Sequence, residues 1–161
     1  MKVLFDTDVV LDLLLDRQPH SVFAGKLLSR VEVGRTSGYL RASAVTTIYF
    51  LAAKVVGAAR ARAEVRRLLG LFEIAPVNRG ILGAALDGKF SDFEDAVTHE
   101  AARQINAQAI VTRNLRDFKH SAIPAYSPAD MLALLEAEET EGERGLHNKG
   151  MQPPAHKARR G

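Results

Sequence analysis

The chain has 161 residues, of which 47% are hydrophobic and 25% charged, and this length and composition suit one globular domain with its own core. Its 22 basic and 19 acidic residues leave a net charge of +3, which is too near balance to indicate a nucleic-acid partner by itself. The lack of cysteine excludes disulfides and thiolate metal sites. No apolar stretch is long enough to cross a membrane, and acids interrupt the N-terminal apolar run too early for a signal peptide, so we expect a cytoplasmic protein.

Four short apolar runs predict β-strands at residues 2–5, 38–43, 72–77 and 109–112, and a weaker fifth run lies at 123–127. The segments between them repeat apolar residues at helical spacing. Strands that alternate with helices predict a parallel sheet, because parallel neighbours need a crossover that is usually helical. We therefore expect a three-layer α/β/α sandwich around a central parallel sheet of four or five strands.

The C-terminal part of the chain changes in composition. Ser127 and Pro128 predict the start of a last helix, as N-cap and first helical residue. Beyond about Glu139 the chain has few apolar side chains and much Gly, Pro and charge. We expect a folded domain over residues 1–136 and a disordered polar tail over residues 137–161.

Acidic residues follow the first strand and gather again at a later helix start. Asp6 comes directly after the strand at 2–5, and Ser91 and Glu94 have the spacing of a capping box. Asp92 and Asp95 would then lie one turn apart on the same face. Acids in a first helical turn also suit the helix dipole, and this purely structural role stays open for the motif alone.

In parallel α/β sheets, ligands bind beyond the carboxyl ends of the strands, where the strand order reverses. Asp6 and the segment "TRNLRDF" at 112–118 both directly follow strands. Several carboxylates that converge there favour a hard cation such as Mg²⁺ or Mn²⁺. Such ions can activate water and stabilise the leaving oxygen of a phosphodiester, so no histidine base is needed. None of the five histidines has the spacing of a metal site or a nucleophile relay.

The segment "DTDVV" also resembles the phosphoaspartate motif of haloacid-dehalogenase-type phosphatases. In that interpretation Asp6 is a nucleophile and Asp8 an acid/base. Such enzymes place a Ser or Thr and then a Lys before a late acidic pair, whereas here "SDFED" precedes Thr112 and Lys119. The phosphatase is therefore a distant alternative.

Five segments resemble the PIN domain family in order and spacing, over residues 1 to about 135. They read "VLFDTDVVLDLLLDR", "SAVTTIYFLAAK", "FEIAPV", "DFEDAVTHEAA" and "AIVTRNLRDF". The family includes the VapC-type toxins, metal-dependent ribonucleases of bacterial toxin-antitoxin pairs. The resemblance implies an α/β sandwich, an acidic pocket for Mg²⁺ or Mn²⁺, an RNA substrate, an antitoxin partner and a homodimer.

By position, the resemblance implies that Asp6, Asp92 and Asp95 hold the metal. Asn114 and Asp117 would complete the catalytic set by orienting ligand or water. Asp8 matches a position that usually holds Asn or another small polar residue.

Two positions depart from the family pattern. Many members carry Glu where this chain reads Thr46, Thr47 and Ile48, and many carry Asp at the position of Asn114. Fewer carboxylates lower the negative charge of the site, so metal affinity falls and the binding of a second ion is disfavoured. A catalytically weak or inactive PIN-like module that binds RNA or protein is therefore an alternative.

Basic residues supply candidates for contact with RNA. Arginines crowd one predicted helix, and they form either a solvated face or a phosphate-binding surface whose affinity would fall with salt. Further candidates for substrate contact lie elsewhere in the chain. The full set is Arg60, Arg62, Arg66, Arg67, Arg41, Lys54, Thr47, Arg113 and Arg116.

Overall fold

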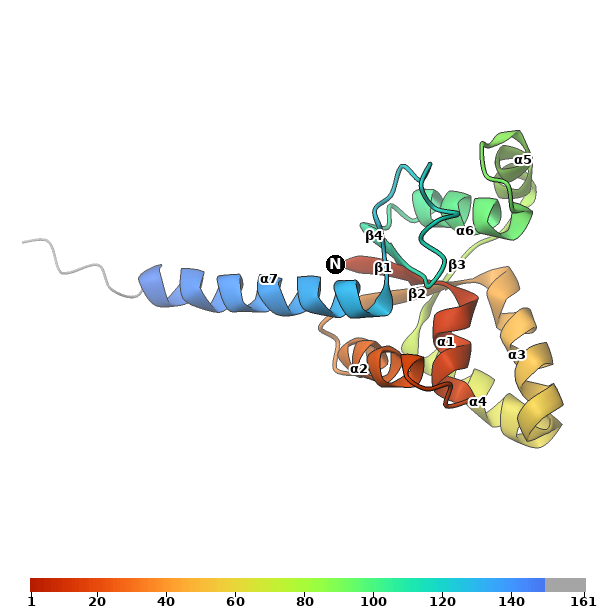
Figure 1. Ribbon diagram of the computed structural model, residues 1–161, viewed down its shortest axis with the longest axis horizontal. Coiled ribbons are helices and arrows are strands. Elements are labelled where there is room, and N and C mark those ends of the chain that lie inside the picture. The colour runs from red at the N-terminus through yellow and green to blue at the C-terminus, as the bar shows by residue number, and fades with distance from the viewer. Residues whose placement is uncertain (150–161) are drawn as a thin grey trace, which may run out of the picture.

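The computed structural model describes residues 1–149 of the chain (Figure 1). Its strands form one parallel five-stranded sheet in the order β3-β2-β1-β4-β5. The strands are β1 (Lys2–Phe5), β2 (Ser37–Arg41), β3 (Glu73–Ala75), β4 (Ala109–Val111) and β5 (Ala125–Tyr126). The predicted parallel α/β fold is confirmed, and every predicted strand is present, four of them shorter than predicted.

Helices cover both faces of the sheet, as Figure 1 shows with α5 and α6 on one side and the others opposite. Side chains alternate across β1, so Val3 and Phe5 join the larger core while Leu4 joins the smaller one. The larger core lies under α1, α2, α3, α4 and α7, and the smaller one under α6. The helices are α1 (Thr7–Leu14), α2 (His20–Glu32), α3 (Ala42–Val56), α4 (Ala58–Leu71), α5 (Arg79–Asp87), α6 (Phe93–Gln104) and α7 (Pro128–Lys149).

The strand order reverses beside β1. β1 pairs with β2 on one side and with β4 on the other, both in parallel, with Val3 opposite Gly38 and Ala109. The chain therefore runs outward from β1 to β3 and then returns to add β4 and β5 on the other side. The gap beyond the carboxyl ends of β1 and β4 is the point where such sheets bind ligands.

Two helix starts test the predicted caps. Ser127 does cap α7, because its Oγ accepts the Asp130 backbone N–H at 3.1 Å. The capping box at Ser91 is wrong: the N-cap of α6 is Asp92, whose Oδ1 accepts the Asp95 backbone N–H at 3.0 Å. Asp is as good a cap as Ser, and the helix therefore begins one residue later than the predicted box.

Helix α7 continues past the predicted domain boundary. Residues 137–149, which the sequence assigns to a disordered tail, extend the helix and point away from the body in Figure 1. Ala, Glu and Leu favour helix in this segment, and Arg30 of α2 pairs with both Glu136 and Glu139. The rest of the predicted tail, residues 150–161, lies outside the described residues.

Candidate functional site

A pocket of about 240 Å³ opens at the carboxyl ends of β1 and β4, between the starts of α1 and α6. Its walls come from four parts of the chain that are far apart in sequence. We call it the acidic pocket, and its lining residues are Asp6, Thr7, Asp8, Thr47, Leu51, Asp92, Glu94, Asp95, Asn114 and Asp117. The predicted metal and catalytic residues, Asp6, Asp92, Asp95, Asn114 and Asp117, therefore share one pocket, and Thr47 lines it from α3.

Asp6 is the most firmly held carboxylate of the acidic pocket. It is 8% exposed, its Oδ1 accepts the Thr7 backbone N–H at 2.8 Å, and its Oδ2 accepts the Thr112 hydroxyl at 2.8 Å. Burial raises the pKa of Asp6, while the hydrogen bonds from Thr112 and Thr7 oppose that rise. Asp6 thus has a fixed orientation in a poorly solvated place, where its charge requires compensation.

Asp95 carries the clearest electrostatic signal. Its pKa is raised from 3.8 to about 7, first by burial and then by the charges of Asp6, Asp92 and Asp117. Asp92 lies close because it caps the same helix. The pocket therefore concentrates more negative charge than its own hydrogen bonds compensate.

Asn114 bridges two of these acids. Its Nδ2 donates to Oδ2 of Asp117 and lies 3.5 Å from Oδ2 of Asp95. Its backbone N–H donates at 3.0 Å to the hydroxyl of Thr112, the same buried side chain that bonds to Asp6. Thr112 therefore couples the two sides of the pocket. Thr112 is not among the predicted site residues, although its position directly after β4 is a signal that marks it.

The donor set fits a hard divalent cation in type and in charge. Carboxylate and amide oxygens are the ligands that Mg²⁺ and Mn²⁺ prefer, and the mutual repulsion at Asp95 is what a cation relieves. Among residues 1–149, however, no three Asp, Glu or His side chains already form a coordination set. Side-chain reorientation is therefore part of any metal binding here.

Arg41, a predicted phosphate contact, is instead an internal group of the site. It is 3% exposed at the end of β2, and its guanidinium pairs with Glu94 and donates to the Ser43 hydroxyl at 2.6 Å. It also lowers the pKa of Asp6 slightly. Because this guanidinium is buried and paired with Glu94, the prediction that Arg41 contacts an RNA phosphate is wrong.

Arg113 is also tied to a buried partner. Its Nε lies 2.9 Å from Oδ2 of Asp12, which is fully buried in α1. The contact is a charge pair without well-aligned hydrogen-bond geometry. Burial raises the pKa of Asp12, and the Arg113 charge opposes that rise. Arg113 thus fastens the segment after β4 to α1, while its side chain, 32% exposed, stays a predicted contact for phosphate.

The remaining basic candidates do not line the acidic pocket. The four arginines of α4 are exposed, and Arg67 pairs with Glu64 at 3.5 Å. Lys54 lies over the Phe50 ring, 4.1 Å from its centroid. Arg116 lines a separate pocket beside the acidic one.

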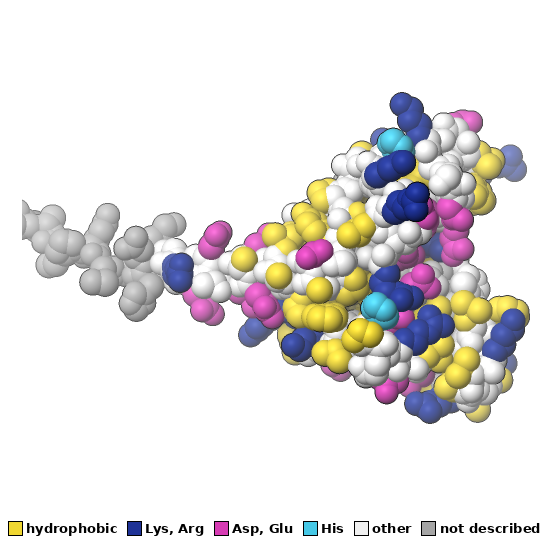
Figure 2. Space-filling model, viewed as in Figure 1, with side chains coloured by type: hydrophobic (Ala, Val, Ile, Leu, Met, Phe, Trp, Pro, Cys, Tyr) yellow, Lys and Arg dark blue, Asp and Glu magenta, His cyan; other side chains and the backbone are white. Residues whose placement is uncertain are grey.

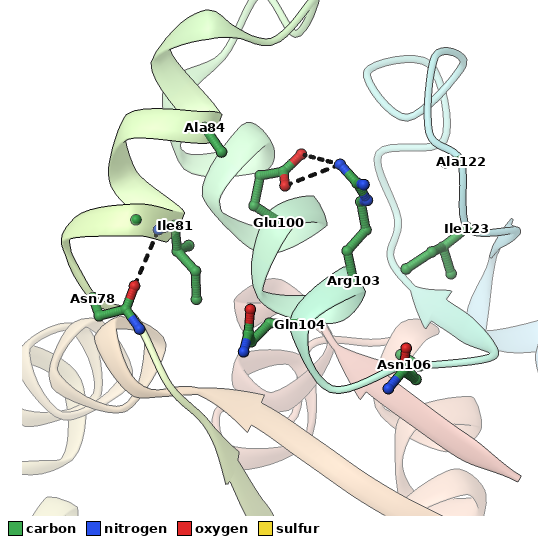
Figure 3. A pocket seen from close by; sticks show the side chains of 11 residues that line it. Asn78, Ile81, Ala84, Glu100, Arg103, Gln104, Asn106, Ala122 and Ile123 are labelled. Carbon is green, nitrogen blue, oxygen red and sulfur yellow. Dashed lines mark hydrogen bonds and ion pairs between the residues drawn. The ribbon is translucent and has the colours of Figure 1, made fainter.

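A larger pocket, of about 750 Å³, lies at the other end of α6 (Figure 3). In Figure 3, Glu100 and Arg103 bond to each other, and Asn78 accepts the Ile81 backbone N–H at the start of α5. These polar groups are satisfied among themselves, and the pocket gathers no set of acids. The acidic pocket is therefore the better candidate for chemistry, although it is smaller.

The family model described as PIN domain matches residues 2–116, which is well over half of the chain. The chain belongs to the PIN domain family. This confirms the predicted resemblance and leaves the phosphatase alternative without support.

Solved structures with the same fold include toxin-antitoxin proteins. VapBC2 from Rickettsia felis, bound to a DNA fragment from its promoter, has a TM-score of 0.61 and 13% identity, over 79% of this chain and 98% of that one. A toxin-antitoxin complex from Klebsiella pneumoniae has a TM-score of 0.59 and 23% identity, over 78% and 97%. VapC20 from Mycobacterium tuberculosis, a toxin that cleaves the sarcin-ricin loop, has a TM-score of 0.58 and 15% identity, over 75% and 95%.

No curated protein matches the chain by sequence. Within the part of the chain that the structure describes, no helix combines the length and apolar character needed to cross a membrane.

Proposed function

We propose that this protein is a divalent-metal-dependent endoribonuclease that hydrolyses RNA phosphodiester bonds. The observation that carries the proposal is the acidic pocket itself. Carboxylates from the end of β1, the start of α6 and the segment after β4 meet there, and burial together with their mutual repulsion raises the pKa of Asp95 to about 7. PIN domains are generally nucleases that depend on divalent metal ions, and this chain is a PIN domain.

Asp6, Asp92 and Asp95 would hold Mg²⁺ or Mn²⁺. The bound ion would supply Lewis-acid stabilisation of the charge that develops on the phosphate. Thr112 fixes the orientation of Asp6 through its 2.8 Å hydrogen bond. Asn114 donates from its Nδ2 to Asp117 and lies close to Asp95. Asn114 and Asp117 would orient substrate or water in the acidic pocket. Thr47 offers a hydroxyl at the wall formed by α3.

We further propose that the protein is the toxin of a type II toxin-antitoxin pair. The support is that similar folds include VapBC2 and a Klebsiella toxin-antitoxin complex. A cognate antitoxin protein is then the expected partner, a homodimer the expected assembly, and the cytoplasm the expected location.

The test is metal-dependent cleavage of a mixed pool of structured RNA by the purified protein. We expect products with Mg²⁺ or Mn²⁺, none with chelator, and none from Asp6→Asn or Asp95→Asn. Asp87→Asn, at the exposed end of α5, is the matched control and should cleave as the wild type does. Retained cleavage in both pocket variants would overturn the proposal.

A second candidate is a PIN-like module that binds RNA or an antitoxin without useful catalysis. Thr47 and Asn114 favour it, because they stand in the pocket where carboxylates would add metal affinity. In that case the protein binds its partner, yet produces no more product than Asp6→Asn. Reproducible metal-dependent product above that control would rule it out.

A further inference from the structure

A second pocket, of about 370 Å³, adjoins the acidic pocket. Asp117 lines both, so the two cavities share a wall. The character of the lining changes across this wall from carboxylates to cations. We call the second cavity the basic pocket, and it is lined by Lys89, Ser91, Arg116, Asp117, Lys119 and His120. In Figure 2, Lys and Arg side chains gather around a histidine on the lobe that holds α5 and α6, beside a group of acids.

The cations of the basic pocket are available to an external anion. Lys89, Arg116 and Lys119 are all exposed. Of the ion pairs formed within residues 1–149, none involves these three side chains. They differ in this respect from Arg41 and Arg113, whose guanidinium groups are paired with Glu94 and Asp12.

We propose that the basic pocket binds a backbone phosphate of the RNA strand, next to the phosphodiester that lies at the acidic pocket. The inference rests on the proposed function. A strand with one phosphate at the acidic pocket carries another at every neighbouring nucleotide, so the adjoining cavity is where the next anionic group falls. Cations there offset the repulsion between the strand and the acids, and they position the strand without reading its sequence.

The arginines of α4 are the competing location for the strand. They number four against the three Lys and Arg side chains of the basic pocket and are also exposed, but none of them lines either pocket. A strand that used α4 would therefore be held away from the wall at Asp117. The two sites can be separated by removing equal charge from each.

The test compares Lys89→Gln/Lys119→Gln with Arg62→Gln/Arg66→Gln in the full chain. KM and kcat are measured with Mn²⁺ and a single-stranded RNA probe. We expect the two lysine substitutions to raise KM roughly ten-fold with little change in kcat, and the two arginine substitutions to leave both constants unchanged. In an Asp6→Asn background, binding of the same probe is measured by fluorescence anisotropy across a salt series. Loss of two contacts should lower the slope of log K against log salt by about 1.4 for a single strand.

The outcomes separate this proposal from the proposed function. If the wild type cleaves with metal, the Lys89→Gln/Lys119→Gln variant matches it in KM, and the same two substitutions leave the salt slope of the Asp6→Asn chain unchanged, the basic pocket is not the phosphate site and the nuclease stands. If the Asp6→Asn chain binds RNA through the lysines but no form cleaves, the pocket stands and the nuclease fails. If the wild type neither binds nor cleaves RNA, both fail. Polyglutamate serves as a second probe, in place of an acidic protein. If the Lys89→Gln/Lys119→Gln variant no longer binds polyglutamate but still binds RNA as before, the pocket belongs to an acidic protein partner and the proposal is overturned.

Discussion

Replacing Asp95 with Asn should stabilise the protein at pH 8 in the presence of chelator. Burial, together with the charges of the neighbouring carboxylates, raises the pKa of Asp95 from 3.8 to about 7. A carboxyl whose pKa is higher in the folded state binds its proton more tightly there, so its ionisation opposes folding. Asn keeps the shape of the side chain and removes the charge.

The size of the effect follows from the pKa values. The difference between 3.8 and about 7 corresponds to a ceiling of about 4 kcal/mol in the free energy of unfolding. Partial exposure of Asp95 reduces this, and the loss of an acid from the first turn of α6 costs about 0.3–1 kcal/mol. We expect a net gain of about 1–2 kcal/mol at pH 8. The gain should shrink as the pH falls from 7 toward 4 and vanish below about 4, where the carboxyl is protonated in both states.

Urea denaturation from pH 4 to pH 8 in chelator measures this gain, with Asp87→Asn as the control for a surface acid. Adding Mg²⁺ at about ten times its Kd should then stabilise the wild type by about 1.4 kcal/mol and the variant by less. An Asp95→Asn protein that is no more stable than the wild type at pH 8, or equally stabilised at pH 4, would refute the reasoning.

Three further predictions concern the surroundings of the site. Arg113→Ala leaves the buried Asp12 carboxylate with the more distant Arg17, 3.8 Å away, and should cost about 1–3 kcal/mol at pH 8 and less at pH 5. Urea denaturation measures the loss, and an equal loss at both pH values would contradict the pairing. Gly38→Ala puts a Cβ 2.8 Å from Phe72 Cε1 and should lower stability by about 1–3 kcal/mol, and a neutral substitution would show that the core yields there. Mg²⁺ should raise the Tm of the wild type but not that of Asp6→Asn, and an equal rise in both would place the ion elsewhere.

Much of the architecture could be predicted because it depends on local patterns. The strand at 2–5 is a short apolar run that ends in Asp6, and the structure places β1 at Lys2–Phe5 with Asp6 directly after it. Because parallel sheets bind ligands at the carboxyl ends of their strands, the sequence also predicts that Asp6 and Asn114 lie at the same site. Asp92 and Asp95 followed because a helix start fixes residues one turn apart.

What the sequence did not predict depends on pairs that are distant along the chain. Arg41 and Glu94 are 53 residues apart, and Thr112 and Asp6 are 106 apart. Nothing in the spacing marks Arg41 as buried or distinguishes it from the exposed arginines. The start of α6 differs for a local reason, since Ser91 and Asp92 are both good caps and only packing decides between them.

The extent of α7 shows that composition alone does not predict where a helix ends. Glu, Gly and few apolar residues predict disorder on average, yet Glu139 of this segment, like Glu136 just before it, pairs with Arg30 of α2, and the helix runs on to Lys149. A tertiary contact at the start of the segment therefore outweighs its polarity.

The most direct test of the central claim is the rate of RNA cleavage as Mn²⁺ is titrated, for the wild type beside Asp6→Asn. The account predicts cleavage that rises with Mn²⁺, disappears with chelator and is absent from the variant at every concentration. Cleavage by Asp6→Asn equal to that of the wild type, or wild-type cleavage that persists in chelator, would contradict it.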